Sequence, residues 1–495
     1  MILRNGVVRT LDPSLPESRA LAIAGDKIAG GVGVHETALA SPETVDLGGR
    51  CVLPGFTDSH VHFPTWAVAQ HEVSLDGCAS LDEALARVRA AELRGEWLRG
   101  YGWRSGDWPG GRDPTRQDLD AITDRPAALI AKDYHSLWLN SSALALAGGD
   151  LEVEGGVVER DTNGEPTGVL REEAAWRFKE RYLRIPDAEY VDAMRAGVKL
   201  ANARGVTCVH DKDGWLGAAG LWQKLGQESL RVWQSVPADT LPELRALSLR
   251  SGIGSPFLRI GYLKVFMDGT LGSQTARMLD GSGVQITSGD ELAEIVRAGA
   301  EAGWPVGVHA IGDRANREAL DAFERTRDAW QPRGLRQRIE HAQCLAPEDV
   351  ARFAELGVAA SVQFSHAPSD RQLAERFWPG KIVYAFRALL DSGALLANGS
   401  DAPIEELDPW AGVVAGVLGT WEPHQTVTLE QALHATCVAP SWLSHDERTR
   451  GTLLPGRAAD LVVLDRDPFA SDLQEVQVVA TMVGGRWVHN PPPWD

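Results

Sequence analysis

The stretch VLPGFTDSHVHF, Val52 to Phe63, joins an apolar run to a Pro-Gly turn and then to a polar end that contains Asp58, His60 and His62. Histidine is scarce in this chain, with 13 in 495 residues, so two of them at the end of an apolar run are a specific signal. Histidines two apart on a strand normally point to opposite faces. Where a strand ends and the chain curls into a loop, both can turn to one ion.

Seven further short apolar or β-branched segments follow this one, and helical stretches lie between most of them. The eight predicted strands cover residues 51–58, 205–211, 229–236, 258–268, 304–310, 335–342, 357–364 and 393–401. Short strands that alternate with helices are typical of parallel βα units. Eight such units predict an α/β fold, a (β/α)₈ TIM barrel over residues 51–451.

Two features do not fit a plain barrel. Residues 1–50 and 452–495 alternate apolar and polar positions, but neither end has enough strands for a core of its own. We therefore expect both chain ends to build one small β-sandwich domain. Residues 59–204 separate the first two barrel strands, which is far too long for an ordinary loop. They predict an insertion subdomain, at about residues 64–200, over the face of the barrel that carries function.

Composition limits the partners. With 49 basic and 68 acidic residues the formal charge is −19, which argues against nucleic acid or an anionic membrane as partner. The chain has no apolar run of the ~18 to 20 residues that a membrane span needs, and its start does not look like a signal peptide. We expect a cytoplasmic enzyme with a small-molecule substrate, and a homodimer is an open alternative to a monomer. Five widely separated cysteines do not form a disulfide framework.

Residues that can bind metal recur at the ends of the predicted strands. One histidine at a strand end is more often structural than a ligand, but in a barrel all strand ends meet on one face. Imidazole and carboxylate together suit zinc, manganese or iron. Asp58 is placed to orient a ligand from behind. The predicted cluster comprises His60 and His62 from strand one, Lys264 from strand four, His309 from strand five, His341 from strand six and Asp401 from strand eight.

Lys264 is the unexpected member, because a lysine inside a barrel is costly unless it is paired. Two interpretations remain open. Its charged head reaches water while its stem stays buried, or its amine has added carbon dioxide to become a carbamate. A carbamate is an anion with two oxygens, so it removes the repulsion between the ammonium and a metal and can bridge two ions.

Nine segments in this order resemble the amidohydrolase superfamily, and within it the amidohydrolase-3 family, the group around the YtcJ-type hydrolases and N-substituted formamide deformylase. They are PGFTDSHVH, GWRSGDWPGGRDPT, HSLWLNSSAL, ARGVTCVHD, LKVFMDGTLGSQTA, GVHAIGD, RIEHAQ, NGSDAPI and LPGRAADLVVLD. The resemblance implies His60, His62 and Asp401 on one metal and His309 and His341 on a second, with carboxylated Lys264 as the bridge. The chain departs from the family at Tyr134, where glycine is common, and at Phe364, where proline is usual.

The resemblance also implies an enzyme that hydrolyses a carbon–nitrogen bond other than a peptide bond, with one or two divalent ions, zinc being expected. Water activated by the metal would attack an amide, formamide or carbamate carbonyl. Asp401 would move the proton from water to the leaving nitrogen. His135, Trp103 and His366 are the predicted substrate contacts, and the tryptophans of the insertion favour an apolar or aromatic group.

Two other classes remain as alternatives. A non-catalytic scaffold on this fold should lack one or more ligands, whereas all six positions are filled here. A metal-dependent deaminase or isomerase would use the same fold, but deaminases of the superfamily generally use one metal and lack the lysine bridge.

Overall fold

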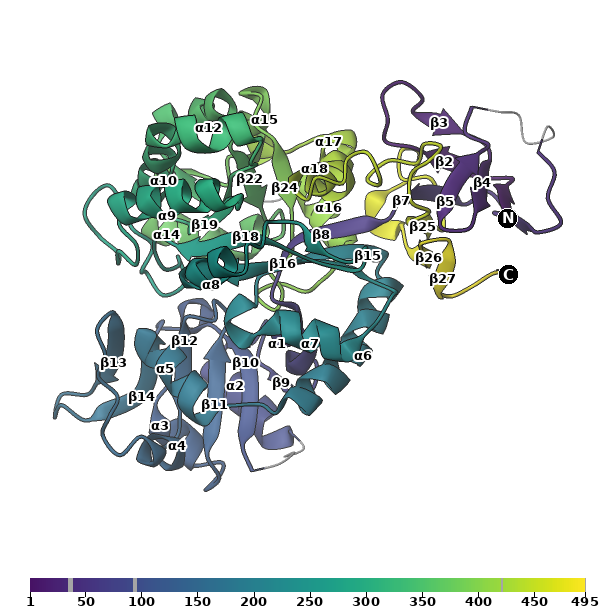
Figure 1. Ribbon diagram of the computed structural model, residues 1–495. Coiled ribbons are helices and arrows are strands. Elements are labelled where there is room, and N and C mark those ends of the chain that lie inside the picture. Colours follow the sequence, from purple (N-terminus) through teal and green to yellow (C-terminus); the bar gives the residue numbers. More distant parts are fainter. Residues whose placement is uncertain (34–38, 92–95, 420–421, 495) are drawn as a thin grey trace.

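The computed structural model describes residues 1–33, 39–91, 96–419 and 422–494. Figure 1 shows three parts: a barrel, an insertion packed against one side of it, and a small β domain where both termini lie. Eight parallel strands are hydrogen-bonded in one sheet, and a bridge between Val61 and Ala402 joins the first strand to the segment that follows the last. In sheet order the strands are β8 (Phe56–Val61), β15 (Val206–Asp211), β16 (Arg231–Pro237), β18 (Leu258–Phe266), β19 (Val306–Ala310), β20 (Arg338–His341), β22 (Ala359–Val362) and β24 (Leu396–Asn398). The predicted (β/α)₈ fold is confirmed.

Helices follow the strands and cover the outside of the barrel. Their sequences show why they form: α9 begins with a capping box between Ser288 and Glu291, and its apolar face packs inward. The main barrel helices are α6 (Asp187–Ala203), α7 (Ala218–Leu225), α8 (Leu241–Ala246), α9 (Gly289–Ala302), α10 (Asp313–Arg325), α12 (Val350–Leu356), α15 (Phe386–Asp391) and α16 (Pro409–Leu418). None of the helices in the described ranges is both long and apolar enough to span a bilayer.

The first predicted strand, 51–58, is two strands in the structure. β7 (Cys51–Pro54) pairs with β2 (Val7–Arg9) and β25 (Leu461–Leu464) in the small β domain, and β8 begins at Phe56 as a barrel strand. The break falls at Gly55, where a side chain would come within 2.2 Å of Thr207 Cγ2, so only glycine fits this close approach. The Pro-Gly turn is therefore the passage from one domain to the other.

The small β domain consists of two sheets built from both chain ends. One contains β5 (Lys27–Gly30), β4 (Leu21–Ala24), β1 (Ile2–Arg4) and β6 (Thr44–Asp46). The other contains β27 (Arg486–His489), β26 (Val478–Val483), β25 (Leu461–Leu464), β7, β2 (Val7–Arg9) and β3 (Glu17–Ser18). Buried residues of both sheets, such as Leu3, Ile23, Val52 and Val463, form one core between them. The N-terminal residues supply the whole first sheet and three strands of the second, and the C-terminal strands β25, β26 and β27 complete the second sheet.

The insertion begins with α1 (Phe63–Ala69) and builds a sheet of its own. The sheet order is β13 (Gly156–Arg160), β14 (Pro166–Glu172), β12 (Ser136–Leu139), β11 (Ala127–Ala131), β10 (Leu98–Trp103) and β9 (Val73–Ser74), and α5 (Glu173–Tyr182) leads back toward α6. Alternate residues face opposite sides, so Trp138 enters one core while Leu137 and Leu139 enter another. Two ion pairs fix this sheet against the barrel, Arg104 with Asp370 at 3.1 Å and Lys132 with Glu405 at 3.1 Å.

Candidate metal centre

The carboxyl ends of the barrel strands open into one cavity of about 1460 Å³, and the insertion forms its opposite wall. All six residues of the predicted cluster line this cavity. They come from five different strand ends, separated in sequence by up to several hundred residues, and the closed barrel brings them to the same face.

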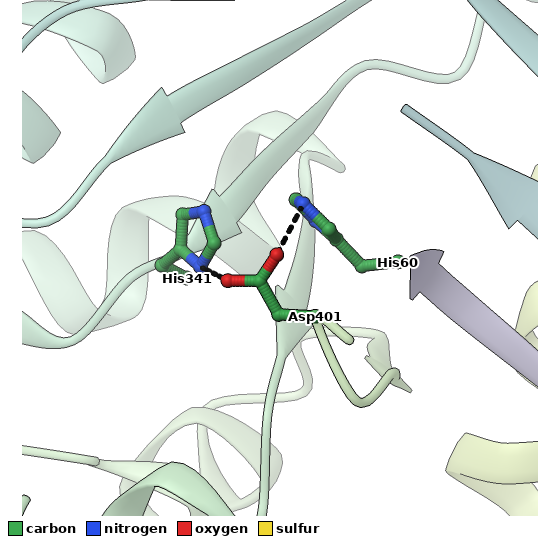
Figure 2. A group of neighbouring side chains, drawn as sticks. All are labelled: His60, His341 and Asp401. Carbon is green, nitrogen blue, oxygen red and sulfur yellow. Dashed lines mark ion pairs between the residues drawn. The ribbon is translucent and has the colours of Figure 1, made fainter. Parts of the chain in front are cut away.

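Asp401 lies at the centre of this cluster, between His60 and His341 (Figure 2). One carboxylate oxygen is 3.2 Å from His60 Nε2, and the other is 3.8 Å from His341 Nδ1. Both Asp401 and His341 have positive φ, 59° and 76°, a backbone region that residues other than glycine seldom adopt. Such strain persists where surrounding structure over-determines it, which is frequent at functional sites.

His62 reaches the same carboxylate from outside the strand. β8 ends at Val61, and His62 is already the N-cap residue of α1, so the strict alternation of the strand no longer holds. Its Nε2 lies 3.5 Å from the Asp401 oxygen that His60 also approaches. The structure thus places both histidines of the SHVH segment beside one carboxylate.

His309 and Lys264 lie on the other side of His341. The His309 and His341 ring centres are 4.6 Å apart. His309 Nε2 is 3.2 Å from the Gly269 carbonyl oxygen, so Nδ1 is the ring nitrogen that does not contact this oxygen. Lys264 is buried on β18, and within the described ranges its amine has no ion pair or hydrogen bond. Burial lowers the pKa of this amine, although the carboxylates of Glu340 and Asp401 oppose the shift. A neutral amine is the form that can add carbon dioxide.

Three residues behind the cluster hold its imidazoles in place. Glu340 Oε2 is 2.9 Å from His60 Nδ1, Asp213 Oδ1 is 2.7 Å from His62 Nδ1, and Gln363 Oε1 is 2.9 Å from His341 Nδ1. In each case the contact fixes the ring so that Nε2 is the free nitrogen, the arrangement usual for ligating histidines. Sequence reasoning missed Glu340 and Asp213 as partners, although each is a charged residue in or next to an otherwise buried strand.

Asp58 acts on the backbone and does not contact an imidazole ring. Its carboxylate accepts hydrogen bonds from the His60 backbone N–H and from the N–H and hydroxyl of Ser400. It thereby ties the end of β8 to the loop that carries Asp401. The expectation that Asp58 orients a ligand side chain is replaced by this contact between two loops. Asp268, at the end of the segment LKVFMD, likewise contacts the backbone: its carboxylate accepts hydrogen bonds from the N–H groups of Arg277, Ile311 and Gly312.

The donor set fits a divalent cation. Across the part of the chain that the structure describes, His60 Nε2 and Asp401 Oδ1 are buried without a hydrogen bond, although they face each other. Burial lowers the pKa of His309 and His341 well below the usual range, so both rings are neutral. Burial disfavours the Asp401 carboxylate, but His60 and His341 outweigh it and hold that pKa well below its ordinary value. Deprotonated imidazoles and a carboxylate are the forms that bind metal.

The three predicted substrate contacts lie around the cavity in different settings. His135 Nδ1 is 2.7 Å from Glu172 Oε2, and its ring centre is 6.0 Å from that of His309. His366 Nδ1 is 3.1 Å from Gln343 Nε2, and its Nε2 lies 3.9 Å from Asp401 Oδ2. Trp103 borders the cavity, but its ring packs against Trp108 and Trp138 and its N–H donates to the Leu129 carbonyl. These tryptophans are the core of the insertion, which leaves Trp103 little capacity for a polar substrate contact.

Comparison with known proteins agrees with this geometry. The model of the amidohydrolase family, Amidohydro_3, matches residues 43–489. A putative amidohydrolase, YtcJ, from Bacillus subtilis is 30% identical over 94% of each chain, and an N-substituted formamide deformylase from Arthrobacter pascens is 28% identical over 98% of this chain and 97% of its own. The crystal structure of an uncharacterized metal-dependent hydrolase from Pyrococcus horikoshii superposes with a TM-score of 0.78, at 29% identity over 96% of this chain and 99% of that one.

The resemblance read from the nine sequence segments is therefore confirmed, and the cavity with its imidazoles and carboxylate is that of a metal-dependent hydrolase. The chain belongs to the amidohydrolase family.

Proposed function

We propose that this enzyme hydrolyses a carbon–nitrogen bond other than a peptide bond in a small amide, formamide or carbamate. The observation that carries the proposal is Asp401, whose two oxygens face His60, His62, His341 and His366 at 3.2 to 3.9 Å in one cavity. The similarity to the Arthrobacter relative, an N-substituted formamide deformylase, supports the class of bond.

We propose that the residues present hold two ions. His60, His62 and Asp401 would hold one, and His309 and His341 would hold the other, with carboxylated Lys264 between them. Zinc suits imidazole and carboxylate donors of this kind. When bound, such ions supply a Lewis acid that lowers the pKa of water and polarises a carbonyl oxygen.

Asp401 is the group that can move a proton. Its carboxylate is held deprotonated, so it can accept the proton of the attacking water and then deliver that proton to the departing nitrogen. The two transfers occur in sequence, so one carboxylate serves both. His135 faces the cavity from the insertion, where Glu172 orients its ring, and its Nε2 side can donate to the oxygen that becomes negatively charged.

A screen of N-formyl, N-acyl and carbamate compounds with the metal-loaded enzyme tests this proposal, with chelator-treated protein as control. We expect release of the free amine by the loaded enzyme alone. Asp401→Asn should lower turnover by about 10² to 10⁴-fold, the contribution typical of general acid–base groups. Turnover by Asp401→Asn at the normal rate would refute the role of Asp401, and ammonia release from ring amidines without amide hydrolysis would favour a deaminase instead.

A further inference from the structure

A second polar region lies in the same cavity, on the side of the insertion. It consists of Glu72, between α1 and β9, Tyr134, between β11 and β12, Lys179 on α5 and Tyr190 on α6. We call these four residues the Lys179 group. None of them coordinates or orients the predicted ligands, so the hydrolytic chemistry does not account for them.

Lys179 is a cation without a partner of opposite charge. Within the ranges that the structure describes, its ammonium makes no ion pair and no hydrogen bond, and Nζ lies over the Tyr134 ring, 5.4 Å from the ring centre. Burial lowers the pKa of this amine, and the more distant Asp213 and Glu72 carboxylates only partly compensate. A desolvated charge that lacks a partner costs free energy. The site therefore gains from any ligand that brings an anion.

The backbone conformation of Tyr134 also indicates a ligand site. Its φ is 61°, in the left-handed region that an aromatic residue seldom adopts. A bulky residue in this conformation costs of order 1–3 kcal/mol, and such strain tends to persist at ligand sites. Its side chain lies beneath the Lys179 ammonium, so the strained residue directly supports the unpaired cation.

The Lys179 group and the predicted metal ligands line the same cavity. The charge of Lys179 acts on Asp213, the residue that holds His62, and on His135. Three aromatic residues line the space beside them. Phe266 lies 4.9 Å from the His309 ring, and the Trp176 and Trp215 rings lie 6.2 Å and 5.2 Å from Phe266. Trp215 is 52% exposed, so it is open to a ligand.

We infer that the substrate is an amide that carries a carboxylate at one end and an aromatic group beside its scissile bond. Lys179 would bind the carboxylate, with the Tyr134 and Tyr190 hydroxyls as further donors, and the aromatic group would pack against Trp176, Phe266 and Trp215. This inference rests on the proposed hydrolase function, and it specifies the substrate of the same site.

The negative charge of an ionised Glu72 disfavours the binding of an anion to the Lys179 group, which provides a second test of the inference. Burial raises the pKa of its carboxyl to about 6, and in the described ranges it has no hydrogen-bond or ion-pair partner either. A bound carboxylate nearby would raise that pKa further, so Glu72 would become neutral and could donate a hydrogen bond. This proton uptake costs binding free energy near neutral pH, so removal of the carboxyl should strengthen the binding of an anion, whereas removal of the Lys179 ammonium should weaken it.

The test compares N-formylphenylalanine with its neutral counterpart N-formylphenylalaninamide, and binding of 3-phenylpropanoate with that of 3-phenylpropanamide. Binding is measured by calorimetry on the metal-loaded Asp401→Asn protein. We expect Lys179→Met to weaken the two acids by about 10- to 100-fold, the value of a charge-assisted hydrogen bond, and to leave the two amides within about twofold. Glu72→Gln should strengthen the acids. Lys199→Met, an exposed lysine on α6, is the matched control and should change nothing.

Equal affinity for acid and amide, or equal losses for both in Lys179→Met, would overturn the inference. If the acids bind through Lys179 but no compound is hydrolysed by the loaded wild-type enzyme, the inference stands and the proposed function fails. If the neutral amides are hydrolysed and Lys179→Met has no selective effect, the proposed function stands and the inference fails.

Discussion

Glu340 Oε2 lies 2.9 Å from Nδ1 of His60, and both side chains are completely buried. The same carboxylate lies 2.7 Å from Arg338 and 3.2 Å from Lys212, so one acid contacts two cations and one predicted ligand histidine. Burial alone would raise the pKa of Glu340, but Arg338 and His60 outweigh burial and hold it well below its usual range. The Glu340 carboxylate therefore balances cations in the interior of the barrel and also contacts a residue of the candidate metal centre.

Replacement of Glu340 should therefore damage both stability and metal binding. Glu340→Gln keeps the shape of the side chain but leaves Lys212 and Arg338 without a counter-charge, which should cost about 3–5 kcal/mol of unfolding free energy. His60 also loses the carboxylate that fixes its ring, so metal affinity should fall about 10- to 100-fold. Urea unfolding and competition with a metal indicator measure the two effects.

Asp213→Asn is the matched comparison, because Asp213 holds His62 as Glu340 holds His60 but has no cationic partner of its own among the described contacts. We expect a similar loss of metal affinity with a smaller loss of stability. Metal affinity unchanged in both variants would show that neither carboxylate orients a ligand.

These two carboxylates also mark the limit of what the sequence could predict. The eight strands and the six residues at their ends were recognisable because each strand has a local apolar pattern and each candidate ligand follows it directly. His62 and Asp213, in contrast, are 151 positions apart, and nothing local relates them. The division of 51–58 into two strands depends on the contact of Gly55 with Thr207, which is equally remote in sequence. The sequence left the insertion tryptophans with two roles, substrate contact or a small core, and the packing of the sheet places Trp103, Trp108 and Trp138 in a core.

Lys264 should be carboxylated in the metal-loaded enzyme. Burial lowers the pKa of its amine, which favours the neutral form that reacts with carbon dioxide. Native mass spectrometry of the loaded protein should show the added mass of one carbon dioxide, and Lys264→Met should lack it and bind fewer ions. Lys132→Met, which removes a lysine paired with Asp76 and Glu405, is the control. A loaded protein with two ions and an unmodified mass would contradict the bridge.

Asp446 should make the free energy of unfolding depend on pH in the acidic range. Its carboxylate pairs with Arg259 on β18 and with Arg450 at 3.0 Å, and although burial opposes ionisation, these two cations hold its pKa well below the usual value. Because the pKa is lower in the folded state, the stabilisation is present above the unfolded value of about 3.9 and is lost as the pH falls below it.

Asp446→Asn should accordingly cost about 3–5 kcal/mol at pH 7, and this difference should shrink toward pH 3. Urea unfolding of wild type and variant at both pH values measures it. Asp328→Asn, in an exposed pair with Arg297, should change little at either pH. A penalty for Asp446→Asn that is the same at pH 3 as at pH 7 would show that packing, and not charge, is responsible.

The pair of His135 and Glu172 should set the alkaline limit of activity. Burial disfavours the imidazolium, but the Glu172 carboxylate at 2.7 Å outweighs burial and raises the pKa of His135. Glu172 is itself fixed by hydrogen bonds from Ser273 and Thr275. A donor on the substrate oxygen must keep its proton, and the raised pKa keeps His135 protonated to a higher pH.

His135→Ala should lower kcat by about 10² to 10³-fold, as for other donors of this kind. Glu172→Gln should move the alkaline limb of the kcat/KM profile to lower pH while the enzyme stays folded and metal-loaded, because the raised pKa of His135 depends on that charge. A uniform loss of activity with no movement of the limb would mean that Glu172 only supports the local fold.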